Sequence, residues 1–251
     1  VETQPDSHRE KNPVAQFLHN ACVARPVSKK EIASTPECQI AQHKEWTRLK
    51  QKGVFDLSSV RNWKDVAREA NAAGRIIHMG RVFGIMVEKN YESVDHRKYK
   101  YRVVFQGNNV VTQNYDVALF QDMGSQPASM EAGKAADCYG LFENHDVEQA
   151  DAEQAYIQAD LTGTETWVAL PRDAWPEEWF DKPASASTGA ADTSYDKYQR
   201  PVVLLKKALY GHPDAGTMWE THCHKRCLKV GFEPVPNWPS CYFHKGLKLM
   251  L

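Results

Sequence analysis

The sequence has no long apolar runs, few cysteines and almost no net charge. Its apolar runs, such as Val202 to Leu205, are far shorter than the roughly 18 residues that a membrane-spanning helix requires. Six cysteines spread over 251 residues are too sparse for a secreted disulfide scaffold, which favours a reducing compartment. No positively flanked apolar stretch follows Val1, so no signal peptide is visible. We therefore expect a protein of the cytoplasm or nucleus that does not bind membranes.

The sequence does have an ordinary globular composition, with 42% hydrophobic and 25% charged residues, but its charge is unevenly distributed. Residues 1–115 carry 19 Lys and Arg against 12 Asp and Glu, residues 116–196 carry 3 against 17, and residues 197–251 carry 9 against 3. An acidic centre between basic flanks suits divalent cations in the centre and an anionic polymer at the edges. A solvated surface explains the same pattern, so charge alone leaves the partner open.

Apolar periodicity and turn residues predict an α+β fold that follows a leader. Residues 1–35 are polar and contain three prolines, which predicts a mobile segment. Three helices are predicted: one over 36–52, one from the cap Ser125 to about Glu143, and one from His212 to Gly231. Strands 81–89 and 99–106 are predicted to form a hairpin, and further strands are predicted at 147–151, 166–170 and 202–206. A last hairpin begins at 240–244 and is cut short at 251. The Ala- and Ser-rich stretch within 172–200 predicts a surface loop.

The first candidate for chemistry is the stretch Arg97 to Arg102, in which four of six residues are basic. On a strand, Lys98, Lys100 and Arg102 share one face because side chains alternate. Three cations without acidic partners suit phosphate groups, and the tyrosines between them are available for stacking. The alternative is a charged hairpin edge that protects against aggregation.

The second candidate is Asp151, at the end of the predicted strand 147–151 and five residues before Tyr156. Carboxylates are hard oxygen ligands that suit Mg²⁺, which usually combines one or two of them with substrate phosphates. The alternative is that Asp151 caps the following turn.

The third candidate is the turn that follows the predicted strand 202–206. Gly211 lies in this turn, and a glycine permits close approach of a ligand or another chain to the backbone. The alternative is an ordinary strand-to-helix turn.

In this order the three segments resemble the reverse transcriptase domain of copia-type long-terminal-repeat retrotransposons. The family motif Arg-Tyr-Lys-Ala-Arg-Leu-Val-Ala-Lys-Gly is matched by residues 98–107, and Gln-Leu-Asp-Val-Lys-Thr-Ala-Phe-Leu by residues 149–157. Leu-Lys-Lys-Ser-Leu-Tyr-Gly followed by Trp is matched by residues 205–211 and Trp219. Weaker matches lie upstream at 45–46, 54–55 and 81–83, so the resemblance covers about residues 37–250.

The resemblance implies that residues 36–251 form the fingers and partial palm of a right-hand polymerase, truncated at its C-terminus, from a Pol polyprotein. Asp151 would be both the catalytic residue and the metal ligand, with Mg²⁺ as the cofactor of two-metal nucleotidyl transfer. The nucleotide-binding residues would be Lys98, Lys100 and Arg102 at the triphosphate, Tyr156 beneath the sugar and Gly211 near the templating pair. The implied partners are an RNA or DNA template-primer, deoxynucleoside triphosphates, and a second copy or other Pol domains. Virus-like particles in the cytoplasm are an implied location.

The sequence departs from the family pattern in ways that bear on activity. The family's Tyr-Val-Asp-Asp motif should follow the strand that begins near Gly246, and the sequence ends at Leu251. After Gly211 the chain has His212 to Gly216, where the family has Leu-Lys-Gln-Ala-Pro. The stretch 172–200 is also longer than the usual connection, which indicates an insertion. We therefore expect RNA-directed DNA polymerase activity of the complete enzyme but not of these residues alone.

Two alternatives stay open beside the polymerase reading. One is a degenerate transposon remnant that at most binds nucleic acid, which the missing Asp pair favours. The other is a small zinc-stabilised binding domain, with Cys223, Cys227, Cys241 and His244 as ligands. A Cys-x3-Cys pair on a helix is more often buried as two small apolar residues, so we expect no zinc.

Overall fold

The computed structural model describes residues 23–120, 124–181 and 196–251, and these form the expected mixture of helices and strands. Within these residues there are six α-helices, a seven-stranded mixed sheet and a small three-stranded sheet. The described residues divide into two units, one of 23–42 and 85–101 and the other of 43–84 and 102–251. None of the helices in these ranges has the length and apolar content needed to cross a bilayer.

The first unit begins with regular structure inside the predicted leader. β1 (Ala24–Pro26) pairs antiparallel with the end of β3 (His78–Lys89), and α1 (Lys29–Ser34) follows. The leader predicted over 1–35 is therefore wrong for residues 24–34, while residues 1–22 lie outside the described part of the chain. α2 (Pro36–Gln51) comes next and confirms the helix predicted over 36–52.

Ion pairs of Arg25 explain why this early segment is ordered. Arg25 contacts the carboxylates of Glu31 and Glu88, each with an N···O distance of 2.6 Å. The hydrogen bond from Arg25 holds the pKa of the Glu31 carboxyl below its usual range. Ser28 caps α1, since its hydroxyl accepts a 3.2 Å hydrogen bond from the Glu31 N–H. A planar guanidinium can bind two carboxylates at once, so Arg25 on β1 links α1, through Glu31, to the end of β3, through Glu88.

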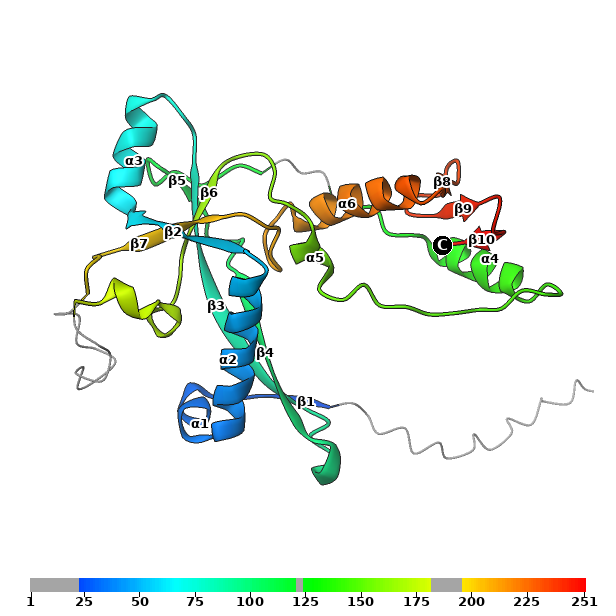
Figure 1. The fold of residues 1–251 in the computed structure, drawn as a ribbon, viewed down its shortest axis with the longest axis horizontal. Helices are drawn as coiled ribbons and strands as arrows, with labels where there is room; N and C mark the ends of the chain where they lie inside the picture. The colour runs from blue at the N-terminus through cyan, green and yellow to red at the C-terminus, as the bar shows by residue number, and fades with distance from the viewer. Residues whose placement is uncertain (1–22, 121–123, 182–195) are drawn as a thin grey trace, which may run out of the picture. The chain divides into compact units, whose positions relative to one another are not determined.

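In the second unit, four strands of the larger sheet follow in the order β3, β6, β7 and β2 (Figure 1). β6 (Thr166–Ala169) runs parallel to β3, β7 (Pro201–Leu205) is antiparallel to β6, and β2 (Phe55–Asn62) is antiparallel to β7. β4 (Lys98–Phe105) and β5 (Val111–Thr112) also pair with β3. The predicted hairpin and the strands at 166–170 and 202–206 are confirmed. The resemblance implies a mainly antiparallel sheet; the β3–β6 pair is parallel, so the sheet is mixed, while the pairs β1–β3, β3–β5, β6–β7 and β2–β7 are antiparallel.

The main core of this unit lies between the sheet and α3 (Trp63–Ala72), a helix that the sequence analysis did not predict. Trp63, Val66 and Ala70 are buried on one face of α3, with exposed fractions of 1%, 4% and 0%. Their spacing of three and four residues places them on one stripe of the helix. They pack against Ile77 before β3, Trp167 on β6 and Val202 on β7.

The C-terminal part of this unit combines α6 (Ala215–Lys229) with β8 (Glu233–Pro234), β9 (Tyr242–His244) and β10 (Leu249–Met250). α6 confirms the helix predicted from His212 to Gly231, and the β9–β10 pair confirms the predicted hairpin. α4 (Met130–Gly140) lies beside this small sheet (Figure 1), where the Tyr139 hydroxyl donates a 2.9 Å hydrogen bond to the Lys248 carbonyl oxygen. α5 (Ala155–Gln158) is one short turn that contacts α6.

Two sequence predictions in this unit need correction. α4 starts at Met130 and not near Ser125, because the Ser129 hydroxyl accepts a 3.2 Å hydrogen bond from the Ala132 N–H and caps the helix there. Residues 147–151 are not a strand but an exposed segment without regular structure, since an acidic and amide-rich stretch offers no apolar face to bury. The Ala- and Ser-rich stretch that predicts a surface loop within 172–200 falls in residues 182–195, outside the described part; the described residues before it form two short 3₁₀ turns, with Trp179 only 2% exposed.

Candidate functional site

The basic face predicted on β4 is present. Lys98, Lys100 and Arg102 are exposed, whereas Tyr101 and Val103 between and after them are buried. The alternation predicted for a strand therefore holds at these five positions. Lys98 and Lys100 belong to the first unit and Arg102 begins the segment of β4 that belongs to the second.

Arg102 meets two of the other predicted site residues at Tyr210, a residue that the sequence analysis did not single out. The Arg102 guanidinium carbon lies 6.0 Å from the centre of the Tyr210 ring. The Tyr156 ring, on α5, lies 5.9 Å from the same ring, centre to centre. Gly211 follows Tyr210 directly in the chain. We call these four residues the Tyr210 corner.

The corner exists because the chain crosses the end of β4 at a glycine. The Phe105 N–H donates a 2.8 Å hydrogen bond to the Tyr210 carbonyl oxygen, which holds the turn against β4. Gly211 has φ +89°, and a Cβ atom there would clash with the Phe105 carbonyl oxygen and lie 2.8 Å from a Val104 methyl group. Only glycine combines this backbone conformation with so close an approach. The turn thereby leaves Tyr210 exposed at the surface, with 52% of the residue accessible.

Asp151 is not part of the Tyr210 corner. It lies in the exposed segment four residues before α5 begins. Among the described residues there is no group of three or more His, Cys, Asp or Glu side chains able to hold a metal ion. One exposed carboxylate does not make a two-metal centre, so the described residues alone do not complete the Mg²⁺ site that the resemblance implies.

The residues of the zinc alternative are occupied in separate contacts. The sulfurs of Cys223 and Cys227 lie 4.0 Å apart on α6, and burial, then the nearby Cys223, raises the pKa of the Cys227 thiol to about 11. The His244 Nδ1 atom accepts a 3.1 Å hydrogen bond from the Leu247 N–H, and its ring packs against Phe232. In the described part of the chain, these groups do not gather into a ligand set for zinc.

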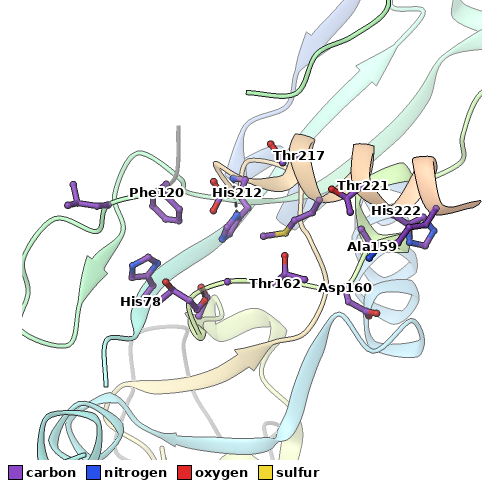
Figure 2. Close-up of a pocket in the computed structure, with 16 residues that line it drawn as sticks. His78, Phe120, Ala159, Asp160, Thr162, His212, Thr217, Thr221 and His222 are labelled. Atoms are coloured by element: carbon purple, nitrogen blue, oxygen red, sulfur yellow. Dashed lines mark hydrogen bonds between the residues drawn. The ribbon is translucent and has the colours of Figure 1, made fainter. Parts of the chain in front are cut away.

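A cavity of about 390 Å³ lies elsewhere in the second unit and was not predicted (Figure 2). Its wall is formed by the start of β3, residues 119–120, the connection from α5 to β6, and the first turns of α6. The side chains of His78 and His212 reach into it, and the Phe120 ring stands beside both (Figure 2). The ring centres of His78 and Phe120 are 5.0 Å apart, and those of Phe120 and His212 are 5.4 Å apart. We call this cavity the histidine pocket.

The two histidines are buried with an unsatisfied ring nitrogen each. His78 is 4% and His212 6% exposed, and the His78 Nδ1 and His212 Nε2 atoms have no hydrogen-bond partner. The Asp214 N–H donates a 3.2 Å hydrogen bond to His212 Nδ1, so the neutral ring carries its proton on Nε2. Burial lowers the pKa of His78, and burial with the nearby His78 lowers the pKa of His212 to about 4. Both imidazoles are therefore neutral at pH 7.

Neither the corner nor the pocket could be located from sequence patterns alone. Tyr210 lies within a recognised motif, but its contact with Arg102 joins residues 108 positions apart. His212 stands at the first position where the chain departs from the family pattern, which is the one signal that could have drawn attention to the pocket. Comparison of the chain with models of protein families, with curated proteins and with solved structures finds no match.

Proposed function

We propose that this chain is the fingers and partial palm of a copia-type reverse transcriptase, and that the activity of these residues is to bind nucleic acid and nucleotides at the Tyr210 corner. The observation that carries the proposal is the meeting of Arg102, Tyr156 and Gly211 at the Tyr210 ring. The resemblance assigns Arg102 to the triphosphate and Tyr156 to the sugar of the incoming nucleotide, and Gly211 to the templating pair, although the three come from segments far apart in the sequence.

The chemistry of the corner suits a nucleotide. A guanidinium forms bidentate hydrogen bonds to phosphate oxygens, and Arg102 is exposed, so its guanidinium is accessible to a phosphate. The half-exposed Tyr210 ring offers a flat face to a base or sugar, and such stacking is worth about 1–3 kcal/mol per base. Gly211 lets the turn pack directly against the end of β4, which places the Tyr210 ring beside Arg102.

Binding without polymerisation is the expected behaviour of residues 1–251. In the complete enzyme, Asp151 would help to hold Mg²⁺, which would supply the two-metal chemistry of nucleotidyl transfer. Asp151 would share those ions with the Asp pair expected beyond Gly246. A transposon remnant that only binds nucleic acid would use the same corner. The polymerase hypothesis and the remnant hypothesis therefore differ in whether a chain extended through the Asp-Asp hairpin and thumb polymerises DNA.

Fluorescence anisotropy with a labelled RNA–DNA hybrid tests the binding proposal. We expect affinity to fall as salt rises, because each phosphate that is neutralised releases counterions. Arg102→Ala should weaken binding and reduce the salt slope by about 1. Arg68→Ala is the matched control, because it removes an exposed arginine from α3, outside the Tyr210 corner. Among the described residues, the ion pair of Arg68 is with Asp65. Salt-independent binding, or equal effects of the two variants, would contradict the proposal.

Primer extension by a chain that continues through the Asp-Asp hairpin and thumb tests the polymerase assignment. We expect activity on an RNA template, and Asp151→Asn should abolish it because the amide lacks the charge that holds Mg²⁺. Glu153→Gln removes an exposed carboxylate two residues away and should leave activity unchanged. An extended chain without activity would favour the remnant, and full activity of Asp151→Asn would refute the role of Asp151.

A further inference from the structure

We infer that the histidine pocket binds a nucleobase, as an uncharged planar heterocycle that takes hydrogen bonds from the buried imidazoles. The inference deepens the proposed function. It rests on that function only for the source of the base, which we take to be a nucleic acid or a nucleotide. The pocket itself is separate from the Tyr210 corner in its residues. It contains two side chains that are more than nine-tenths buried and that lack partners for a ring nitrogen.

The charges around the pocket favour an uncharged ligand. His78 and His212 are neutral, and Lys225 is the one Lys or Arg among the described residues that line the pocket. Asp160 also lines it, but its carboxylate lies 2.6 Å from the Lys207 ammonium. Asp214 adds a second carboxylate to the lining, so an anion would gain little attraction inside. A neutral ligand avoids this repulsion and the desolvation that a charged ligand would need.

The hydrogen-bonding groups require a ligand that has at least one acceptor and leave room for donors. Because His212 carries its proton on Nε2, this atom needs an acceptor such as a carbonyl oxygen or a ring nitrogen. The exposed hydroxyls of Thr162 and Thr221 at the mouth can donate or accept. The edge of a nucleobase presents carbonyl oxygens, ring nitrogens and N–H groups within one plane.

The shape of the pocket suits a flat ring. The Phe120 ring stands at ring-packing distance from both imidazoles and supplies an aromatic face beside them (Figure 2). Met218 adds an apolar surface from α6. A volume of about 390 Å³ lies at the small end of the range of roughly 300–1,000 Å³ that is usual for small-molecule sites. Exposed Lys225 in the lining could contact the phosphate of a nucleotide whose base is inside.

Nuclear magnetic resonance of the chain, labelled with ¹³C in its histidine rings, tests the inference directly. The probes are uridine, thymidine, cytidine, adenosine and guanosine at millimolar concentration, with ribose and inorganic phosphate as controls. We expect at least one nucleoside to shift the ring C–H signals of both His78 and His212 in a saturable way, whereas ribose and phosphate leave them unchanged. Unmoved signals with all five nucleosides, or a saturable response to phosphate, would overturn the inference.

A pair of conservative variants keeps the test specific. Thr162→Val removes one exposed hydroxyl at the mouth and should weaken nucleoside binding about threefold to tenfold, which is the range expected for one hydrogen bond. Thr47→Val removes a hydroxyl from α2, outside the pocket, and should not change binding. Equal affinities of the two variants would count against the assigned site.

Competition and a corner variant separate this inference from the proposed function. If a single-stranded oligonucleotide displaces the nucleoside and an abasic oligonucleotide does not, the bound base comes from a strand. If neither oligonucleotide displaces the nucleoside, the pocket binds a free nucleoside. Both results support base binding. Arg102→Ala should leave the nucleoside response intact. A wild-type chain that fails to bind the hybrid yet keeps this response would refute the proposed function and not the pocket.

Discussion

Acidification should destabilise the second unit through His212, and the size of the effect follows from its burial. The pKa of His212 is about 4 in the folded chain, against 6.5 for a free imidazole, and burial is the main cause. Between pH 6.5 and pH 4 the unfolded chain therefore binds a proton that the folded chain does not. Stability must fall as the pH falls through this window and level off below it. At roughly 1.4 kcal/mol per pH unit, the full loss is about 3 kcal/mol.

The assay is urea denaturation followed by tryptophan fluorescence at several pH values between 7 and 4. All seven tryptophans belong to the second unit, so the signal reports on the unit that contains His212. The matched variant is His212→Asn, whose side-chain oxygen can still accept the Asp214 N–H but cannot be protonated in this range. The variant starts from lower stability because it is smaller, so the quantity to compare is the change with pH.

We expect the wild-type chain to lose about 2–3 kcal/mol more than His212→Asn on going from pH 7 to pH 4. Groups distant from His212 titrate alike in both proteins and cancel in the comparison, whereas Asp214, whose pKa is raised by burial, and His78, whose pKa is lowered by burial, are neighbours of His212 and contribute to the difference. Parallel pH curves for the two proteins, within about 0.5 kcal/mol, would refute the assignment of a buried neutral imidazole at His212.

Three further predictions follow from the packing. Gly211→Ala should lower the melting temperature and weaken hybrid binding together, since the strained φ alone costs about 1–3 kcal/mol and the added Cβ also clashes with the Phe105 carbonyl; unchanged melting would disprove the crossing. Trp63→Ala should cost about 3–5 kcal/mol in urea denaturation, because this 1% exposed ring anchors α3 on the sheet, and a loss below about 1 kcal/mol would contradict that packing. Iodoacetamide at pH 7.5 should alkylate exposed Cys138 well before Cys227, whose pKa of about 11 keeps it a thiol, and peptide mass spectrometry would reveal the opposite order.

Local patterns account for much of the fold. The strands β3, β4, β6 and β7 follow from runs of β-branched and aromatic residues, and α2 and α6 follow from helical spacing with turn residues at their ends. α3 was missed although its buried residues at positions 63, 66, 67 and 70 fit helical spacing, because charged residues surround them in the sequence. The strand predicted at 147–151 rested on one valine beside acidic and amide residues, and such a stretch has nothing to bury.

The candidate site depends on contacts that no local pattern encodes. The alternation of Lys98, Lys100 and Arg102 was predictable because it is a property of one strand. The place of Tyr210 beside Arg102 depends on how the sheet brings together segments that are distant in sequence. The tautomer of His212 likewise depends on one backbone hydrogen bond from Asp214, which only the folded turn provides. Asp151 was assigned through a strand that does not form.

The glycine crossing at the end of β4 has a consequence for how the chain folds during synthesis. The hydrogen bond from Phe105 to Tyr210 joins residues that are 105 positions apart, so it closes only after most of the second unit has been made. Contacts of such separation form late because the entropy of the intervening chain must be lost first. A nascent chain that has not yet reached Gly211 therefore carries β4 without the turn that covers its end. At the ribosome, this strand end waits for a partner that is made about 105 residues later, and chaperones that recognise unpaired strands would find it there.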